Sequence, residues 1–362
     1  MTVKPDVRLP EVPYRLVRLG VLMSPEVGDP NEAEGVLNPA SGRTPDGRLH
    51  LLPRIVAAGN VSRVGLVEVE LSDAGVPVGV DRRGVVLEPD EDWERGALGS
   101  GVEDPRTTWM RDLGVHVMSY VAFGPSGPTP ALAVSDDLLS WRRLGPLHFE
   151  YEPELATDLN LFPNKDVVLF PEPVIAPDGV ESYAFLHRPM WDLAWVLPGE
   201  GVHLPAGVTD ERPGIWVSFA PAAAVRADIR AIGHLSQHRA VALSEFPFEL
   251  LKIGAGPPPI RVPEGWLLIH HGVSGTMAPG WVVQLDVHYA AGAMILDADD
   301  VTKVIARTAE PLLMPEVPEE LVGTVANVVF PTAIEEVGGV LYVFYGMADA
   351  RIGVARLERT DT

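Results

Sequence analysis

Residues 112–123 read DLGVHVMSYVAF, a glycine turn that leads into an unbroken apolar and aromatic run. A turn of this kind before β-branched and aromatic residues predicts a hairpin that feeds a buried strand. The same plan recurs four more times, in PDGRLHLLPRIV (45–56), PDGVESYAFLHRP (177–189), PEGWLLIHHGV (263–273) and VGGVLYVFYGMAD (337–349). The chain is therefore expected to repeat one β unit five times.

A shorter proline-containing segment precedes each of these turns, and a third apolar run follows each strand. The corresponding prolines are spaced by 66, 66, 87 and 73 residues, and they are Pro39, Pro105, Pro171, Pro258 and Pro331. Self-similarity at such a period, with several antiparallel strands per unit, is typical of propeller blades. We predict an all-β, five-bladed β-propeller with its active site in the central channel; an irregular β-sandwich with coincidental turns is the alternative.

The predicted propeller is a single domain over residues 1–362. An N-terminal extension is expected at about 1–30, and an insertion at about 190–212 lengthens the longest interval between prolines. A short helix is expected near 219–232. Trp191 and Trp195 in the insertion are candidates for stacking on a sugar, and packing is the equal alternative.

The composition excludes several functional classes. The chain has 362 residues, a formal charge of −22 and no cysteine, so disulfides, thiolate metal sites and cysteine nucleophiles are excluded. It shows no basic stripe for nucleic acid, no run of 18 apolar residues and no apolar secretory segment at its start. We expect a cytoplasmic protein that needs no metal or cofactor and has no nucleic-acid or membrane partner.

Polar residues collect at one end of the predicted strands. In an antiparallel pair, the start of the inner, proline-containing strand and the end of the next strand lie on the same face. The inner strands offer Asn38, Glu103, Asp104, Lys165 and Glu172 at their starts, and the next strands offer Arg54, Tyr120, His187, Arg188, His271 and Asp349 at their ends. These side chains are expected to surround one mouth of the channel, which is how a rigid scaffold builds a site.

The adjacent acids in GVEDPRTTWM (101–110) are the most informative pair. Side chains alternate along a strand, so only one of Glu103 and Asp104 is expected to face the channel, while the other pairs with a neighbour such as Arg106. Paired acids at a polar pocket suggest cleavage of a glycosidic bond. The plainer alternative is that both acids only pair with arginines at a blade junction. For the same reason, His270 and His271 should point to opposite faces and make poor joint metal ligands.

Several motifs together resemble glycoside hydrolase family 130. They are EDPR (103–106), NKD, VLFPEP and HRP across 164–189, GWLLIHHGV (265–273), HYAAGAMILDADD (288–300) and the closing NVVFP, LYVFYGMAD and IGVA. The resemblance extends from about Asn38 to Ala355. It implies a five-bladed propeller and inverting phosphorolysis of β-mannosides. In that reaction inorganic phosphate, as co-substrate, attacks the anomeric carbon of a non-reducing mannosyl unit and gives α-mannose 1-phosphate.

The resemblance also implies roles for single residues. Asp104 would be the general acid, passing its proton through a mannose hydroxyl to the glycosidic oxygen. The expected phosphate ligands are Lys165, His187, Arg188, Tyr289 and Arg143, although strand direction places Arg143 toward the opposite face. The expected sugar contacts are Asn38, Arg54, Glu103, His271 and Asp349. Cations at the mouth suit a dianion, because charge-assisted hydrogen bonds hold phosphate strongly.

Two other functions remain open at this point. A β-mannoside hydrolase on the same scaffold would need a second carboxylate roughly 6.5–9.5 Å from the acid, and Glu172 or Asp349 are the candidates. A non-catalytic glycan-binding propeller is the third possibility. The linkage (β-1,2 or β-1,4), the acceptor sugar and the oligomeric state, which could be a homo-oligomer, are not determined by the sequence.

Overall fold

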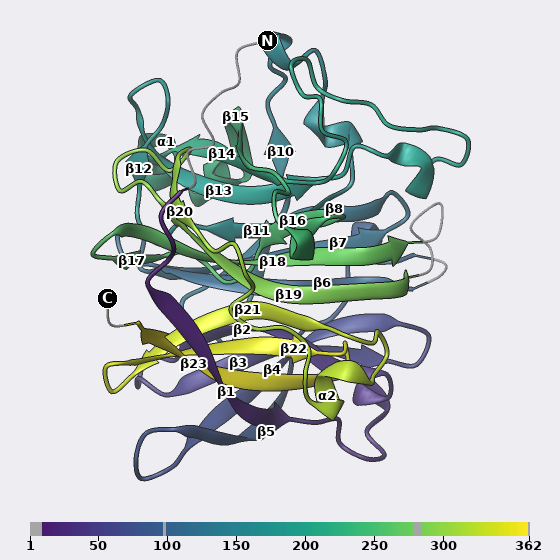
Figure 1. Cartoon of the computed structure of the whole chain (residues 1–362), viewed down its shortest axis with the longest axis vertical. Helices are drawn as coiled ribbons and strands as arrows, with labels where there is room; N and C mark the ends of the chain where they lie inside the picture. Colours follow the sequence, from purple (N-terminus) through teal and green to yellow (C-terminus); the bar gives the residue numbers. More distant parts are fainter. Residues whose placement is uncertain (1–8, 97–98, 278–283, 361–362) are drawn as a thin grey trace.

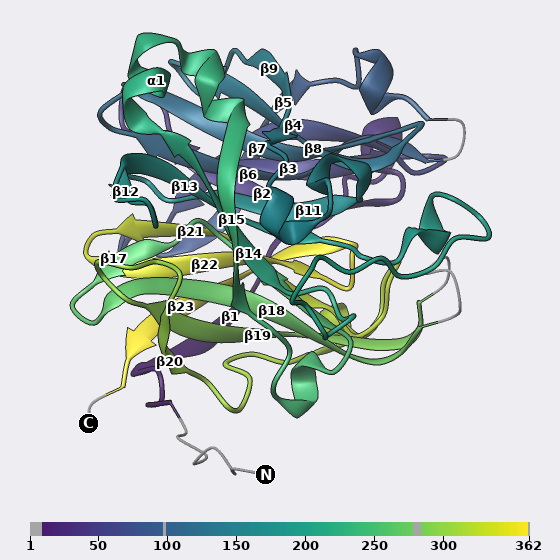
Figure 2. The ribbon, with the colours of Figure 1, turned by 90° about the horizontal axis from the view of Figure 1, so that it is seen from above.

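The structure, a computed structural model, describes residues 9–96, 99–277 and 284–360. It confirms the five-bladed β-propeller (Figures 1 and 2). Three blades are separate sheets, and the other two share one eight-stranded sheet because β4 and β6 meet in a short parallel pairing. The innermost strands of neighbouring blades contact one another at four of the five junctions, and at the fifth the inner strand of blade 5 contacts other strands of blade 4. This arrangement places the starts of all five inner strands around one opening.

The strands of each blade follow one another outward from the centre. Blade 1 contains β2 (Gly35–Arg43), β3 (Leu49–Ala57), β4 (Val61–Leu71) and β5 (Pro77–Leu87). Blade 2 contains β6 (Ser100–Met110), β7 (Val115–Gly124), β8 (Gly127–Ser135) and β9 (Arg142–Pro146). Blade 3 contains β11 (Asn164–Leu169), β12 (Val174–Ile175), β13 (Glu181–Pro189), β14 (Ile215–Pro221), β15 (His234–Ala242) and, at its outer edge, β10 (His148–Phe149).

Blades 4 and 5 complete the ring. Blade 4 contains β16 (Lys252–Ala255), β17 (Ile260–Val262), β18 (Gly265–Met277), β19 (Gln284–Leu296) and β20 (Val304–Arg307). Blade 5 contains β21 (Val329–Val337), β22 (Val340–Met347), β23 (Arg351–Arg359) and β1 (Tyr14–Met23). The short helices are η1 (Pro30–Glu32), η2 (Asp92–Glu94), η3 (Pro153–Leu155), η4 (Leu159–Leu161), η5 (Leu193–Trp195), α1 (Ala222–Ala227), η6 (Ile229–Gly233), η7 (Pro247–Glu249) and α2 (Pro318–Leu321).

The N-terminal strand closes the propeller. β1 pairs antiparallel with β23, so the two ends of the chain share blade 5, and the purple β1 lies beside the yellow β23 in Figure 1. Residues 14–23 therefore belong to the blade, which corrects the expected N-terminal extension over about 1–30. β1 thereby becomes the outermost strand of blade 5 and covers the edge of β23.

The proline alignment was correct for three blades and wrong for two. Pro39, Pro105 and Pro331 lie inside the inner strands β2, β6 and β21. Pro171 and Pro258 instead follow β11 and β16, in the breaks that separate these strands from β12 and β17. The inner strands of blades 3 and 4 therefore begin earlier than expected, and Lys252 starts the one in blade 4.

The core consists of five apolar clusters, each between two neighbouring blades. β13 shows how the sequence builds them: Tyr183 and Phe185 pack toward blade 2, and Ala184 and Leu186 pack toward blade 4. A strand buried on both faces needs apolar residues at successive positions. This explains the unbroken apolar runs that revealed the repeat.

Four blades also contain a buried ion pair that we call a glutamate clasp. In each, a glutamate at the third position of a short helix forms an ion pair with an arginine on the outermost strand of the same blade. The pairs, with their N–O distances, are Glu32–Arg82 (2.8 Å), Glu94–Arg143 (2.8 Å), Glu249–Arg307 (2.7 Å) and Glu320–Arg18 (2.8 Å). Each clasp ties the loop before an inner strand to the outer edge of its blade.

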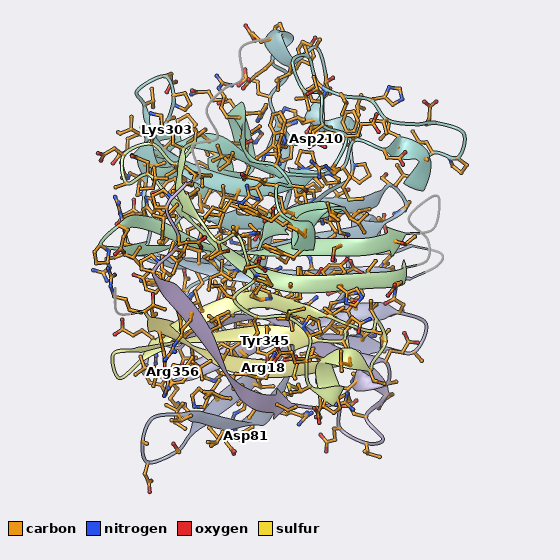
Figure 3. The ribbon with its side chains drawn as sticks, viewed as in Figure 1. Arg18, Asp81, Asp210, Lys303, Tyr345 and Arg356 are labelled. Atoms are coloured by element: carbon orange, nitrogen blue, oxygen red, sulfur yellow. The ribbon has the colours of Figure 1, made fainter. Side chains whose placement is uncertain are left out.

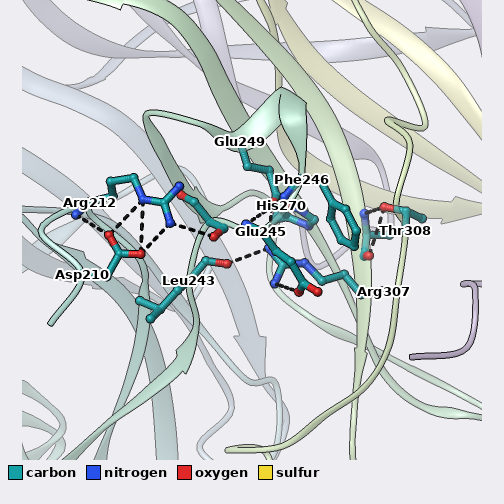
Figure 4. A network of polar contacts seen from close by, with 11 residues as sticks. Asp210, Arg212, Leu243, Glu245, Phe246, Glu249, His270, Arg307 and Thr308 are labelled. Atoms are coloured by element: carbon teal, nitrogen blue, oxygen red, sulfur yellow. Dashed lines mark hydrogen bonds and ion pairs between the residues drawn. The ribbon is translucent and has the colours of Figure 1, made fainter. Parts of the chain in front are cut away.

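In three of the clasps, a ring on the strand that pairs with the inner strand also contacts the glutamate: Tyr120, His270 and Tyr345. His270 contacts Glu249 at 2.8 Å beside Arg307, as Figure 4 shows. The Tyr345 hydroxyl donates to Glu320 at 2.9 Å, and Tyr345 lies close to Arg18 in Figure 3. Backbone N–H groups add further donors, as at Glu249. These contacts compensate the cost of burying a charge.

The remaining local expectations concern blade 3. α1 and η6 confirm a short helical segment near 219–232. Trp191, 1% exposed, packs against Phe162 and Trp216, so it belongs to the core and does not serve as a sugar platform. The side chain of Trp195 lies outside the described residues. Within the described ranges, no helix is long and apolar enough to cross a membrane.

Candidate active site

A cavity of about 230 Å³ opens where the inner strands begin. It is lined by four acids, four cations and a histidine, with aromatic and apolar groups between them. The lining residues are Asn38, Arg54, Glu103, Asp104, Phe123, Lys165, Asp166, Arg188, Met190, Lys252, His271, Tyr289, Val328, Phe330 and Asp349. All five blades contribute, so the site exists only when the ring is closed.

Three of the inner strands present their polar residue through the same backbone device. Asn38, Asp104 and Asp166 have positive φ angles of 42°, 47° and 57°. Each lies at a break in the pairing register between the inner strand and its neighbour. Asn and Asp adopt this left-handed conformation more readily than other non-glycine residues. A bulge re-aims a side chain, and here it turns all three toward the cavity.

The bulge also corrects the expectation for the adjacent acids. Both Glu103 and Asp104 line the cavity, because the positive φ of Asp104 breaks the alternation of a regular strand. Arg54 joins them, at 2.8 Å from Glu103 and 3.1 Å from Asp104. Arg106 pairs with neither carboxylate in these contacts; its guanidinium donates to the backbone carbonyls of Asp104 and Gly256.

Asp104 has a second fixed partner. The Asn38 side-chain amide donates to Asp104 at 2.8 Å, on the same oxygen that Arg54 contacts. Burial raises the pKa of the Asp104 carboxyl, but the charges of Arg54 and Lys165 outweigh burial and hold the pKa below its usual 3.8. The cavity therefore keeps Asp104 ionised until a ligand changes its surroundings.

Two further ion pairs line the cavity, one between blades 2 and 3 and one within blade 3. Lys165 contacts Glu103 at 3.1 Å rather than the neighbouring Asp166. Asp166 instead binds Arg188 at 2.5 Å and lies 3.5 Å from His271. Gly254 makes room for this group, since a Cβ there would lie 2.1 Å from the Asp166 carboxylate. Lys165 and Arg188 are thus each held by an acid.

Two titrating groups have pKa values shifted toward neutrality. Burial raises the pKa of Asp349 to about 6, with Arg54 opposing the shift and Asp104 adding to it. Burial lowers the pKa of Lys252 to about 7, with Arg188 adding to the shift and Asp166 opposing it. Such shifts cluster at functional sites. Both groups can change charge when an anion or a sugar enters the cavity.

His271 differs from these two groups. Burial lowers its pKa to about 3 despite the nearby Asp166, so the ring is neutral near pH 7. His271 faces the cavity and His270 faces the Glu249 clasp, which confirms that the two rings point in opposite directions. Among the described residues, no group of three His, Asp or Glu side chains is placed to hold a metal ion.

The structure does not bring every expected residue to the cavity. His187 is buried in a separate network, in which Asn164 contacts one ring nitrogen at 3.0 Å and Ser218 the other at 2.8 Å. Strand alternation explains this: Arg188 faces the cavity, so its neighbour His187 faces the blade interior. The expectation that His187 binds phosphate directly is therefore wrong, because its ring does not line the cavity.

Three other candidates also lie elsewhere. Arg143 on β9 and Tyr120 on β7 both bind Glu94 in the clasp of blade 2, which removes Arg143 from the expected phosphate ligands. Glu172 lies in the turn after β11, 54% exposed, and pairs with Arg261. The remaining expected residues do line the cavity: Asn38, Arg54, Glu103, Asp104, Lys165, Arg188, His271, Tyr289 and Asp349. Their roles there are predictions.

Sequence reasoning missed Asp166 and Lys252. Lys252 was overlooked because Pro258 was taken to mark the inner strand of blade 4. Asp166 was considered only as a partner for Lys165. A usable signal was present for Asp166, since NKD (164–166) repeats the polar strand start of VED (102–104). Phe330, whose ring packs against His271 with centroids 4.5 Å apart, also lines the cavity.

The model of a family described as beta-1,4-mannooligosaccharide phosphorylase matches residues 18–361. The chain belongs to this family, glycoside hydrolase family 130.

Individual relatives show the extent of the likeness. The chain is 32% identical to a 1,2-beta-oligomannan phosphorylase of Thermoanaerobacter sp. over 72% of this chain and 69% of the relative. It is 41% identical to a beta-1,4-mannooligosaccharide phosphorylase of Ruminococcus albus over 53% of this chain and 47% of that protein. Its fold is similar to that of a Listeria innocua beta-1,2-mannobiose phosphorylase, with a TM-score of 0.65, 20% identity and 96% and 97% of the two chains covered.

Proposed function

We propose that this protein is an inverting β-mannoside phosphorylase that transfers a non-reducing mannosyl unit to inorganic phosphate. One observation carries the proposal: the cavity of Asp104 is also lined by four cations, Arg54, Lys165, Arg188 and Lys252. A hydrolase that activates water has no need of so many cations, whereas a phosphate dianion does. The names of the relatives agree with this activity.

The division of labour among the cations follows from their partners. Arg54 is bound by Glu103 and Asp104, so it serves the acid side of the cavity. Arg188 is held by Asp166, and Lys252 interacts electrostatically with both. We assign phosphate to Arg188, Lys252 and Lys165, with Tyr289 beside them, since the Lys252 ammonium lies 5.3 Å from the Tyr289 ring centre.

The reaction needs one proton donor. Asp104, in its acid form, would give a proton to a mannosyl hydroxyl, whose own proton passes to the glycosidic oxygen. The bond from that oxygen to the anomeric carbon breaks as a phosphate oxygen bonds to the same carbon from the opposite face. The incoming phosphate supplies the negative charge that raises the pKa of Asp104, because a like charge disfavours ionisation. Asn38 and Arg54 orient the carboxyl through its one shared oxygen.

The mannosyl unit would be held by the polar groups on the other side of Asp104. Asn38, Asp349 and Glu103 offer carboxylate and amide groups that match sugar hydroxyls. Phe330 and Val328 supply apolar surface in the same cavity. A pocket with a few placed polar groups on an apolar wall is typical of small-molecule sites.

The decisive experiment measures release of mannose 1-phosphate from β-1,2- and β-1,4-mannobiose with and without added phosphate. We expect product only with phosphate, and the preferred disaccharide identifies the linkage, on which the family description and the Thermoanaerobacter relative differ. Equal release of free mannose in phosphate-free buffer would reject the phosphorylase.

A hydrolase remains the second candidate because Asp349 shares the cavity with Asp104. The pKa of Asp349, raised to about 6, is in the range of a general base. Glu172, the other candidate base, is excluded by its exposed position outside the cavity. A glycan-binding propeller without activity is tested by the same assay on a broad panel of glycosides.

Several finer assignments stay predictions. The reaction would be of the glycosyltransferase type, because a mannosyl group moves to phosphate. The cytoplasmic location and a homo-oligomeric state rest on sequence reasoning, and so does the expected independence from metals and cofactors. Activity after treatment with a chelator, and the mass of the protein in solution, test the last two.

A further inference from the structure

A second cavity lies at the opposite end of the inner strands. Its volume is about 430 Å³, larger than that of the candidate active site. It is lined by Ser41, Gly42, Arg43, Thr44, Pro45, Thr107, Trp109, His116, Asp136 and Glu335. On β2, the five steps along the strand from Asn38 to Arg43 span roughly 16 Å, which separates the two cavities along the channel.

Direct contacts between inner strands separate the two cavities. The Thr107 hydroxyl donates to the backbone carbonyl of Ser41, and the Thr332 hydroxyl donates to that of Pro39 at 2.7 Å. The Arg106 guanidinium bridges to the carbonyl of Gly256 at 2.9 Å. A ligand in the second cavity therefore lies in a site of its own and does not extend from the active site.

Trp109 gives this cavity a fixed aromatic wall. The indole is 43% exposed, although it lies on the inner strand β6. It pairs across the strands with His116, and the two ring centres are 4.6 Å apart. His116 is buried and its Nε2 lies 3.1 Å from the carbonyl of Arg43, so the ring that supports the indole is itself anchored. An exposed aromatic surface held in one orientation is pre-organised for stacking.

Planar polar groups surround this wall. The Arg43 guanidinium donates to the carbonyls of Gly47 and Glu336, which fixes its position, and it lies 3.9 Å from the Glu335 carboxylate. Asp136 is exposed at the rim. The cavity has two carboxylates, Asp136 and Glu335, and one guanidinium, Arg43, so it disfavours an anion. The carboxylates can accept hydrogen bonds from hydroxyl groups, and the guanidinium can donate to them. The chemistry fits a neutral, polyhydroxylated ligand with one apolar face.

A second pocket lies beside this cavity. This neighbouring pocket of about 270 Å³ shares Asp136 with the cavity and is lined by residues of β7, β8, β9, α1 and η6, among them Arg142 and Arg226. We propose that this face of the propeller is a non-catalytic site for a neutral oligosaccharide chain, with Trp109 stacking on one pyranose ring. That the chain is a β-mannooligosaccharide rests on the proposed function; the site itself does not.

The test separates this site from the active site. Binding of β-mannohexaose, β-mannobiose and cellohexaose is measured by calorimetry on the Asp104→Asn protein in phosphate-free buffer, which prevents turnover. We expect two classes of site for mannohexaose. Trp109→Ala and Asp136→Ala, made in the same background, should each remove the weaker class. Tyr151→Ala, which removes an exposed aromatic residue outside both cavities, should retain both classes.

Kinetics gives an independent readout in otherwise unchanged protein. Trp109→Ala should leave phosphorolysis of both mannobiose and mannohexaose within about twofold of the parent protein, because the second site does not extend from the active site. A single class of site that survives both substitutions would overturn the proposal. A second site that binds cellohexaose as well as mannohexaose would uphold the oligosaccharide site and reject its mannan preference. Absence of phosphorolysis with two intact binding classes would reject the proposed function alone.

Discussion

Buried acid–arginine pairs occur in two regions of this propeller, and they differ in what surrounds them. In the clasp of blade 2, Glu94 is fully buried, and Arg143, Tyr120 and a backbone N–H all donate to it. In the central cavity, Arg54 is shared between Glu103 and Asp104, and the carboxylates face open volume. The first arrangement satisfies its charge internally, whereas the second leaves charge available to a ligand.

The comparison teaches how to separate structural ion pairs from functional ones. Both regions contain an arginine beside an acid that precedes or begins an inner strand. The clasp glutamates reach the outermost strand of their own blade, while Glu103 and Asp104 in the cavity meet residues of neighbouring blades. A buried carboxylate with all its hydrogen bonds made indicates a structural role. A carboxylate that faces a cavity with some of its bonding capacity unused indicates a functional role.

The largest effect is expected from removing the proton donor. Asp104→Asn should lower kcat by ~10²–10⁴-fold, the usual contribution of acid catalysis, while substrate binding changes much less. Glu94→Gln, the matched change in a clasp, should leave kcat of the folded protein near the parent value. Initial rates of mannose 1-phosphate release and calorimetric binding distinguish the two. Similar losses of kcat in both variants would show that the two regions do not differ in function.

The next effect concerns stability and belongs to the clasps. Glu249→Gln leaves the buried Arg307 with only the exposed Glu245 as a charged partner and should cost about 3–5 kcal/mol of unfolding free energy. Chemical denaturation measures this loss, with the exposed Glu310→Gln as the control. A loss below about 0.5 kcal/mol, the range of surface substitutions, would contradict a structural role for the clasp.

The same clasp predicts a dependence on pH. Burial raises the pKa of Glu249, but His270 and Arg307 outweigh it and lower the pKa from 4.5 to about 2. Because the unfolded chain binds this proton more readily, the stabilisation is present above about pH 4.5 and is lost as the pH falls toward 2. The difference in stability between the parent protein and Glu249→Gln should therefore shrink in acid. A gap that stays constant down to pH 2.5 would reject this origin.

A smaller effect is expected for Lys252 in the cavity. Lys252→Met should raise KM for phosphate by about 10- to 100-fold, the cost of one charge-assisted hydrogen bond, with kcat less affected. In the parent protein, KM for phosphate should rise above pH 7, as the lysine with a pKa of about 7 loses its charge. Lys252→Met should lose most of that rise. Phosphate kinetics from pH 5.5 to 8.5 test both statements.

The smallest effect has the opposite sign. Asp349 has its pKa raised from 3.8 to about 6, so the folded protein holds this proton more tightly than the unfolded chain. Its stabilising contribution is complete below pH 3.8 and is lost as the pH rises through 6. Asp349→Asn should therefore raise Tm at pH 7.5 by roughly 2 °C or more and lower activity. A fall in Tm at pH 7.5 would show that Asp349 is structural, like the clasp glutamates.

Local pattern in the sequence determined the architecture of this protein. Five glycine turns before apolar runs identify five blades, because a strand buried on both faces must be apolar throughout. Strand direction then placed Asn38, Arg54, Asp104 and Asp349 at one mouth, and all four line the cavity. These inferences need only the periodicity of strands and turns, which neighbouring residues encode.

Only the tertiary structure decided which polar residues share the cavity and which are buried elsewhere. The bulge at Asp104 turned both adjacent acids inward, and the break between β16 and β17 brought Lys252 into the ring. Arg143 and Arg54 are both arginines beside acids, yet one closes a blade and the other faces the cavity. Their difference depends on partners distant in sequence and on single-residue shifts in register, and a shift of one residue moves a side chain to the other face.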